Sequence, residues 1–128
     1  MKVLFICHAN VGRSQMAEAY YNHLTKSNDA FSAGVEDYSK KYPVLPKLLV
    51  DLMAEEGIDI SAQKPKPLNE KMVVVSDRVF VLCSKDECPS YLFSDKTVFW
   101  DVVDPHHMSV EDTRKIRDLI KSKVLSII

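Results

Sequence analysis

The residue types best suited to catalysis occur together near the N-terminus, between a short apolar run and a stretch with helical periodicity. This loop consists of the eight residues Cys7, His8, Ala9, Asn10, Val11, Gly12, Arg13 and Ser14. A loop of this length between a strand and the start of a helix turns several backbone N–H groups inward around one point, and the helix dipole adds a positive field. The sequence therefore predicts that these residues bind a tetrahedral oxyanion.

Two side chains of this loop, Cys7 and Arg13, are separated by five residues. The planar guanidinium of Arg13 can hold two oxygens of an anion at once. The positive field favours the thiolate of Cys7, so that Cys7 is expected to act as a nucleophile beneath the bound anion. Ser14 can donate a hydrogen bond to the sulfur, Asn10 can brace the loop, and Gly12 supplies backbone freedom. The spacing disfavours the simpler interpretation of a buried structural cysteine beside a solvated arginine.

A second chemical feature is the Asp104-Pro105 pair, which lies between the last predicted strand and the last predicted helix. A carboxylic acid held over the anion site can protonate a leaving oxygen and later activate water. Pro105 would stiffen the loop that directs it. Asp and Pro are also common in turns that have no catalytic role, and Asp101 is a rival acid by its distance in sequence. These observations alone do not decide whether Asp101 or Asp104 is the acid.

Two further cysteines, Cys83 and Cys88, bound a short polar segment that begins where a predicted apolar strand ends. We therefore expect Cys83 on the same rim as Cys7. The pair can act as a relay, in which one thiol attacks a sulfur-bound intermediate at Cys7 and the other carries the disulfide to the surface for an external reductant. In the alternative, Cys83 belongs to the core and Cys88 is incidental. A zinc site with His106 and His107 is disfavoured, because adjacent histidines are awkward co-ligands.

Short apolar runs alternate with amphipathic stretches, which predicts a three-layer α/β fold whose parallel sheet is covered on both faces. Strands are predicted at 2–7, 30–33, 77–83 and 96–100, and helices at 14–26, at 45–56 and from 109 onward. Gly57 is the predicted C-cap of the second helix, and 64–67 (Lys-Pro-Lys-Pro) is a predicted extended loop. In such folds the active site lies beyond the carboxyl ends of the strands, where Cys7, Cys83 and Asp104 all fall.

The composition is that of an ordinary globular protein. The 128 residues are 46% hydrophobic and 27% charged, with a net charge of −1, and they predict one domain spanning 1–128. This charge argues against a nucleic-acid partner and a polybasic membrane anchor, and no apolar run approaches the roughly 20 residues of a membrane span. The odd count of 3 cysteines argues against a secreted disulfide scaffold and predicts a cytoplasmic protein with reduced thiols.

The Cys-x5-Arg-Ser spacing at the N-terminus resembles the low-molecular-weight protein tyrosine phosphatase family and its sister branch, the thioredoxin-coupled arsenate reductases. The resemblance runs along the whole chain and extends beyond the loop. It includes Ser14-Gln-Met-Ala-Glu18, Phe31-Ser-Ala-Gly34, Gly57-Ile-Asp-Ile-Ser61, Leu82-Cys-Ser84 and Asp104-Pro105. The resemblance implies a four-stranded parallel sheet flanked by helices, and it gives Asp104 the role of the acid that protonates the leaving group.

Several positions distinguish the two branches of this family. The reductase branch has two further cysteines with a similar short gap, as Cys83 and Cys88 have. It also has Gln after the Arg-Ser pair, where this chain has Gln15 and phosphatases tend to have Pro. Phosphatases usually place aromatic residues after Asp-Pro, where this chain has His106 and His107. These features together favour the reductase branch.

Two other positions depart from the patterns of the relatives. Gly12 stands where relatives often carry a second loop cysteine, so one candidate for a protective disulfide with Cys7 is missing. Lys66 stands where some reductases use an acidic residue in a potassium site, so activation by a metal ion is not assumed.

The sequence therefore predicts an arsenate reductase, in which Cys7 attacks arsenic, Cys83 forms a disulfide with Cys7 and releases arsenite, and Cys88 takes over that disulfide. We expect no bound cofactor and no metal. We do expect an external thioredoxin-like thiol reductant. The alternative is a protein tyrosine phosphatase, which would form a phosphocysteine at Cys7 from a phosphoprotein, with Asp104 as the acid. A third hypothesis, a non-catalytic anion-binding or phosphocysteine carrier module, would tolerate the loss of Arg13 and Asp104, and both are present.

Overall fold

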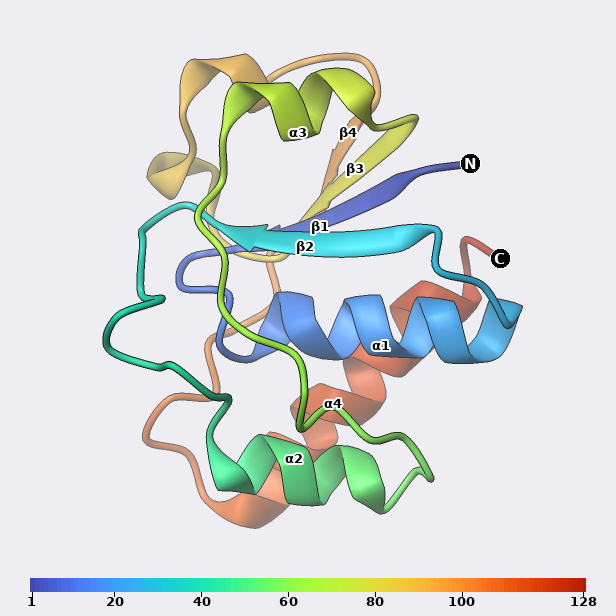
Figure 1. The fold of residues 1–128 in the computed structure, drawn as a ribbon, viewed down its shortest axis with the longest axis vertical. Coiled ribbons are helices and arrows are strands. Elements are labelled where there is room, and N and C mark those ends of the chain that lie inside the picture. The colour runs from blue at the N-terminus through green and yellow to red at the C-terminus, as the bar shows by residue number, and fades with distance from the viewer.

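The computed structural model describes all 128 residues, and its centre is a parallel sheet of 4 strands in the order β2-β1-β3-β4 (Figure 1). The strands are β1 (Val3–Cys7), β2 (Ala30–Gly34), β3 (Arg78–Val81) and β4 (Thr97–Phe99). All pairings are parallel, so the carboxyl ends of the strands lie together, at the end of the molecule opposite to the two termini (Figure 1). The predicted parallel sheet of four strands is confirmed.

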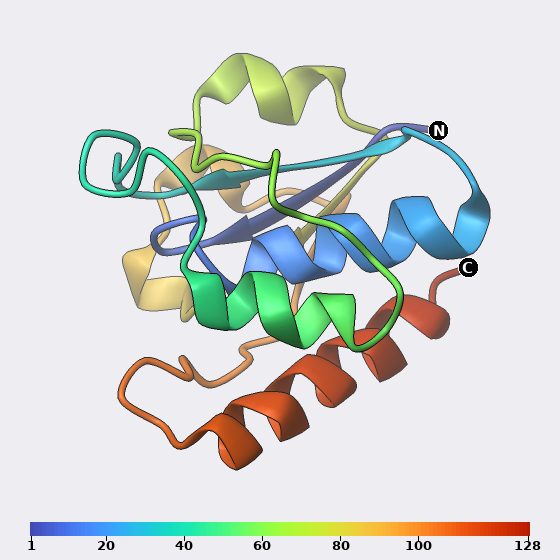
Figure 2. The same cartoon turned by 60° about the horizontal axis from the view of Figure 1, so that its bottom comes forward.

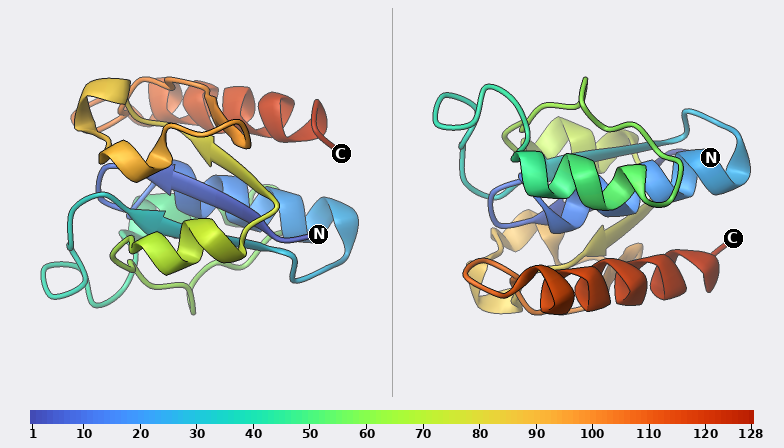
Figure 3. Two further views of the ribbon diagram at one scale, coloured as in Figure 1. Left: turned by 90° about the horizontal axis from the view of Figure 1, so that it is seen from above. Right: turned by 90° about the horizontal axis from the view of Figure 1, so that it is seen from below.

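Helices cover both faces of this sheet, which confirms the three-layer α/β architecture (Figures 2 and 3). The helices are α1 (Arg13–Thr25), α2 (Lys47–Ala54), α3 (Glu70–Val75) and α4 (Val110–Leu125), with two 3-10 turns, η1 (Lys85–Glu87) and η2 (Ser90–Leu92). α1 and α4 pack on one face, and α2 lies outside them, whereas α3 and η2 lie on the other face (Figure 3). No helix is both long enough and apolar enough to cross a bilayer.

The central strand β1 is buried on both sides, which explains why its sequence is continuously apolar. Val3, Phe5 and Cys7 contribute to the core under α1 and α4, whereas Leu4 and Ile6 contribute to the core under α3. Successive side chains of a strand point to opposite faces, so Cys7 faces the α1 side at the carboxyl end of the sheet.

The predicted end of α2 is built from the glycine that the sequence indicated. Gly57 has a φ of 73°, its N–H donates to the carbonyl of Ala54 at 3.0 Å, and the N–H of Ile58 donates to the carbonyl of Met53 at 3.1 Å. This is a Schellman motif, in which glycine adopts the left-handed conformation without a Cβ clash. The helix is shorter than predicted, because Pro46 precedes its first turn.

Helix α3, of 6 residues, was not predicted from the sequence. Its Val73-Val-Val75 run is β-branched and carries no helical periodicity. The available signal was Asn69, whose side chain accepts a hydrogen bond from the N–H of Met72 at 3.0 Å as an N-cap. The helix matters for the site because it covers the face of the sheet on which Cys83 lies.

Candidate active site

Cys7 ends β1, and α1 begins at Arg13, so the predicted oxyanion loop is a tight connection at the carboxyl edge of the sheet. The Cys7 thiol is buried and lies 2.9 Å from the Ser14 hydroxyl oxygen. The Asn10 side-chain amide donates to that same oxygen at 2.7 Å. The Ser14 hydroxyl therefore accepts from Asn10 and has its own proton free to donate to the sulfur. The backbone N–H of Asn10 also donates to the sulfur at 3.3 Å, and both donors favour a thiolate.

A buried amide network holds this loop from behind. The Asn10 Oδ1 accepts from the backbone N–H of Lys66 at 2.9 Å and from the Gln15 Nε2 at 2.9 Å. Gln15 also donates to the carbonyl of Lys64 at 2.9 Å, and its own Oε1 accepts from Gln63 at 2.7 Å. Gln15 thus ties the loop to the extended 63–66 segment, a structural role that its position after Arg-Ser did not reveal.

The left-handed residue of the loop is not its glycine. Gly12 has a φ of −142° and a ψ of −87°, and the backbone freedom expected of it stays a prediction. The left-handed residue is Asn10, with a φ of 58°, a conformation that asparagine tolerates better than most residues. The sequence did not reveal that Gly34 packs against the loop. A Cβ at Gly34 would lie 2.7 Å from the carbonyl carbon of Ala9. Only glycine lets the end of β2 approach the loop this closely.

Arg13 projects its guanidinium toward the carboxyl ends of the strands while remaining only 7% exposed. Its Nη1 donates to the carbonyl of Val102 at 2.9 Å and to that of Leu82 at 3.2 Å. These carbonyls hold one side of the guanidinium, and Nη2 lies 3.8 Å from the Asp104 carboxylate. Nε and Nη2 donate no hydrogen bond, so they remain available to two oxygens of an anion.

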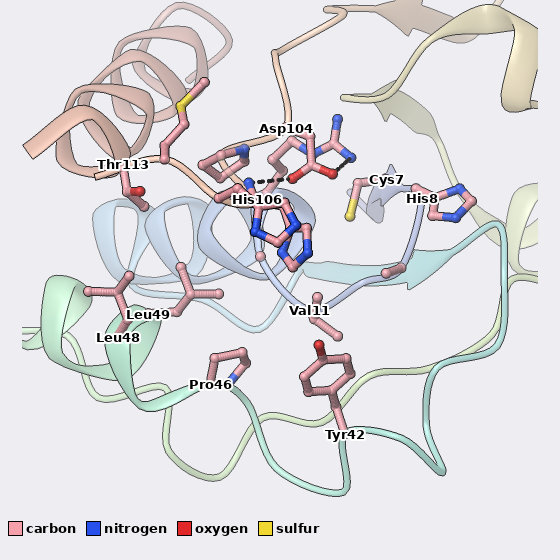
Figure 4. A pocket seen from close by; sticks show the side chains of 16 residues that line it. Cys7, His8, Val11, Tyr42, Pro46, Leu48, Leu49, Asp104, His106 and Thr113 are labelled. Atoms are coloured by element: carbon pink, nitrogen blue, oxygen red, sulfur yellow. Dashed lines mark hydrogen bonds and ion pairs between the residues drawn. The ribbon is translucent and has the colours of Figure 1, made fainter. Parts of the chain in front are cut away.

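Asp104 lies at the mouth of the loop and is largely exposed. Its Oδ1 accepts from the backbone N–H of His106 at 2.9 Å, which turns the other oxygen toward Arg13 (Figure 4). Asp104 lines the cavity that contains Cys7, whereas Asp101 does not. The geometry therefore separates the two candidate acids that the sequence alone could not.

The cavity over the loop has a volume of about 200 Å³ and is larger than one inorganic oxyanion. A cavity needs about 10–15 Å³ of such volume to hold one water molecule, so four oxygens need roughly 40–60 Å³. The remaining space is bordered by Tyr42, Pro46 and Leu49 on one side and by His106 on the other (Figure 4), and His107 also lines the cavity. The two histidine rings, 3.8 Å apart between centroids, form a wall where the phosphatase pattern has aromatic residues.

The remaining loop residues contribute mainly through their backbone. Ala9 and Val11 line the cavity, and the carbonyl of His8 accepts from the N–H of Glu36 at 2.9 Å. The His8 ring turns away from the cavity floor: its Nδ1 lies 3.0 Å from the Glu87 carboxylate, and its edge packs against Tyr38.

Cys83 follows the end of β3, beside Cys7 in the sheet, but its side chain points to the other face. It is completely buried with Val81 and Leu92 beneath α3 and does not line the cavity. The expectation that Cys83 shares the rim with Cys7 therefore holds for its backbone and is wrong for its thiol. Alternation along the strand causes this difference, because Cys83 keeps the orientation of Val81 rather than that of Leu82.

Burial raises the pKa of the Cys83 thiol well above the ordinary range, and negative charge on Cys88, Cys7 or Glu87 would raise it further. Burial also raises the pKa of Cys88, and a side-chain hydrogen bond with Cys83 opposes that rise. Cys88 packs against the buried cluster that contains Cys83, and it is itself only partly buried. In this structure Cys83 is therefore a protonated thiol, and it lies on the opposite face of the sheet from Cys7.

Behind the loop, Lys66 brings an ammonium group to a buried carboxylate. Its Nζ lies 3.9 Å from the Glu18 Oε1, which also accepts from the Ser32 hydroxyl at 2.8 Å. Burial raises the pKa of Glu18, and the Lys66 charge opposes that rise. The lysine therefore supplies a positive charge at the position where the reductase pattern has an acidic ligand. No group of three or more His, Cys, Asp or Glu side chains is arranged to hold a metal ion.

A buried cysteine that accepts a backbone N–H, an arginine fork and an exposed carboxylate at the mouth together define an enzyme site for a tetrahedral oxyanion. The comparisons with known proteins agree with this class. The family model of the low molecular weight phosphotyrosine protein phosphatases matches residues 2–128, and the chain belongs to that family.

Relatives of both branches are similar to this chain over almost its whole length. An arsenate reductase of Staphylococcus aureus is 33% identical over 122 residues, which cover 93% of this chain and 89% of the relative. A low molecular weight protein tyrosine phosphatase of T. tengcongensis superposes with a TM-score of 0.85 at 28% identity, covering 99% of this chain and 97% of that one. A thioredoxin-dependent arsenate reductase of Corynebacterium glutamicum has a TM-score of 0.78 at 29% identity, covering 98% of this chain and 59% of that one.

Proposed function

We propose that this chain is an arsenate reductase that uses Cys7 as its nucleophile and Cys83 and Cys88 as a thiol relay. The observation that carries the proposal is the placement of two thiols, buried Cys83 and Cys88 packed against its cluster, directly beyond the strand next to the Cys7 loop. A phosphatase needs only the loop, whereas a reductase also needs thiols that can be oxidised. The relatives named arsenate reductase support the same choice.

In the first step, arsenate occupies the loop, with its oxygens held by backbone N–H groups and by the free side of Arg13. The Cys7 thiolate attacks arsenic, and a sulfur–arsenic bond forms as an arsenic–oxygen bond breaks. The leaving oxygen departs as water when Asp104, at the mouth of the loop, supplies a proton. Ser14 holds the thiolate in place before the attack, since its hydroxyl proton points at the sulfur.

In the second step, the Cys83 thiolate attacks the Cys7 sulfur. The sulfur–arsenic bond breaks, its electron pair stays on arsenic, and arsenite leaves while a Cys7–Cys83 disulfide remains. The Cys88 thiolate then attacks Cys83, which releases the Cys7 thiolate and forms a Cys83–Cys88 disulfide. One arsenate is reduced for every two thiols oxidised.

An external dithiol of the thioredoxin type then reduces the Cys83–Cys88 disulfide, and the protein needs no bound cofactor. Cys88 suits this exchange, because it is the partly exposed member of the pair. The thioredoxin dependence of the Corynebacterium glutamicum relative supports this class of partner. The cycle starts from three reduced thiols, so we place the enzyme in the cytoplasm.

The test is arsenate-dependent oxidation of NADPH in the presence of thioredoxin and thioredoxin reductase, with p-nitrophenyl phosphate hydrolysis measured on the same preparation. Sustained arsenate turnover is expected in the unmodified enzyme. Cys88→Ser should stop repeated turnover and leave aryl-phosphate hydrolysis intact, because only the relay uses Cys88. Reduction that survives Cys88→Ser unchanged would show that the relay is wrong.

A phosphomonoesterase is the second candidate, and the cavity is the observation that favours it. Most of its roughly 200 Å³ lies beyond the space of an inorganic oxyanion, and Tyr42, Pro46 and Leu49 border it. An organic leaving group fits there, opposite Cys7. Brisk hydrolysis of p-nitrophenyl phosphate without arsenate turnover would support this candidate over the reductase.

A further inference from the structure

The proposed relay leaves one geometric problem, which is how the Cys83 thiol reaches Cys7. The two side chains point to opposite faces of the sheet, and Cys83 is sealed beneath Leu92 and α3. The segment after Cys83, residues 84–88, must therefore swing around the end of the sheet. An unguided swing would make the attack of one thiol on the other slow, because such reactions depend on holding the reacting atoms close together.

One polar contact joins this segment to the oxyanion loop. The Glu87 Oε1 lies 3.0 Å from the Nδ1 of His8, the residue directly after the nucleophile. No hydrogen bond and no other ion pair links residues 84–88 to residues 7–14. The His8 Nδ1 is itself shielded from solvent and has no hydrogen bond of good direction. Glu87 is therefore its only available partner, and a small shift of the segment would align the two groups.

The other oxygen of Glu87 holds the near end of the same segment. Oε2 accepts from the backbone N–H of Ser84 at 3.0 Å, and the Ser84 hydroxyl accepts from the N–H of Asp86 at 3.3 Å. These contacts form a capping box around the turn η1. One carboxylate thus connects the residue after Cys7 with the residue after Cys83, and Cys88 follows it directly in the chain.

We propose that His8 and Glu87 form a tether that guides the relay segment to the oxyanion loop and so sets the rate at which Cys83 attacks Cys7. This inference rests on the proposed reductase function. Both are positioning residues, since the His8 ring is turned toward Glu87 and Glu87 lies outside the cavity lining. When the turn opens to release Cys83, the Glu87–His8 contact keeps the segment at the edge where Cys7 lies.

A purely electrostatic role for Glu87 makes the opposite prediction. Its negative charge raises the pKa of both Cys83 and Cys88. Removing that charge would then increase the thiolate fraction and speed the attack, whereas loss of the tether slows it. The sign of the change in rate therefore separates the two roles.

The variant that isolates the tether is Glu87→Gln, because glutamine can keep the capping-box bond to Ser84 while it loses the charge facing His8. The matched control is Asp86→Asn, which removes one negative charge from the same turn. The Asp86 side chain makes no hydrogen bond and no ion pair. Each change is made in the full chain with Cys88→Ser, so that the Cys7–Cys83 disulfide accumulates. The readout is the rate of disulfide formation after addition of arsenate, measured by alkylation and mass spectrometry.

Glu87→Gln should slow disulfide formation about two- to fivefold, the size expected for the loss of one half-exposed polar contact. Asp86→Asn should not slow it, and p-nitrophenyl phosphate hydrolysis should be the same in both. His8→Gln combined with Glu87→Gln should be no slower than the slower single change, because both remove one contact.

An unchanged or faster rate in Glu87→Gln overturns the tether and leaves the proposed function standing. A parent enzyme that forms no Cys7–Cys83 disulfide with arsenate overturns the proposed function and the tether with it. Equal slowing by Asp86→Asn also overturns the tether, since it would assign the effect to the stability of the turn.

Discussion

The oxyanion loop and the relay segment of residues 84–88 lie at the same edge of one sheet, yet they differ in how far they are organised at rest. In the loop, Cys7, Ser14 and Asn10 are already linked by hydrogen bonds, and Arg13 is fixed by two carbonyls. In the relay, Cys83 faces away from Cys7 beneath a separate part of the core. The first region is set for chemistry, and the second must rearrange.

This difference teaches what each step of the cycle requires. Binding and attack on a small anion gain from fixed dipoles, because these stabilise charge without moving during the reaction. A reactive thiol close to Cys7 would be oxidised prematurely, whereas one that is buried and protonated is protected. Burial of Cys83 therefore keeps the relay inactive until an intermediate on Cys7 makes the exchange productive.

The largest effect is expected from the nucleophile. Cys7→Ser should abolish arsenate reduction and aryl-phosphate hydrolysis alike, because both begin at that sulfur. Cys83→Ser should abolish sustained reduction and spare hydrolysis, which is measured with p-nitrophenyl phosphate. Loss of hydrolysis in Cys83→Ser would contradict the separation of the two regions.

Asp104→Asn should slow hydrolysis by roughly 10²–10⁴-fold, the usual contribution of a general acid. The reason is that Asp104 overhangs the cavity and faces Arg13, whereas Asp101 lies outside the cavity lining. The measurement is kcat for p-nitrophenyl phosphate, and Asp101→Asn is the matched control. A comparable loss in Asp101→Asn would transfer the acid role to Asp101.

The two relay thiols should differ in their rates of alkylation. Cys83 is fully buried and its pKa is raised well above the ordinary range, so at pH 8 it is protonated and shielded from reagent. We expect iodoacetamide to modify Cys88 at least about tenfold faster than Cys83, as read by peptide mass spectrometry. The difference should vanish in denaturant. Equal rates in the native protein would mean that the segment opens freely at rest.

The smallest effect concerns the backbone beneath the loop. Gly34→Ala brings a Cβ to 2.7 Å from the Ala9 carbonyl carbon and should cost about 1–3 kcal/mol in the free energy of unfolding, with a fall in kcat as the loop is displaced. Gly57→Ala, which meets no atom but has a φ of 73°, should cost about 1 kcal/mol and leave kcat unchanged. Urea unfolding and hydrolysis assays check both, and normal kcat in Gly34→Ala would remove Gly34 from the site.

Sequence patterns were sufficient where one contiguous stretch carries the information. The apolar run of β1 predicts a strand buried on both faces, and Cys7 through Ser14 form a loop whose chemistry depends on neighbours in the chain. Gly57 ends α2 through local hydrogen bonds for the same reason. Local patterns failed at α3, since a short β-branched helix depends on what it packs against.

The amino-acid sequence by itself determined the fold class, the nucleophile and the oxyanion loop, because apolar periodicity and the Cys-x5-Arg spacing act over a few consecutive residues. Only the tertiary structure decided which way Cys83 points, that Gly34 abuts Ala9, and that Glu87 meets His8. These contacts join residues far apart in the chain. They depend on strand register and on the two faces of the sheet, which no local pattern encodes.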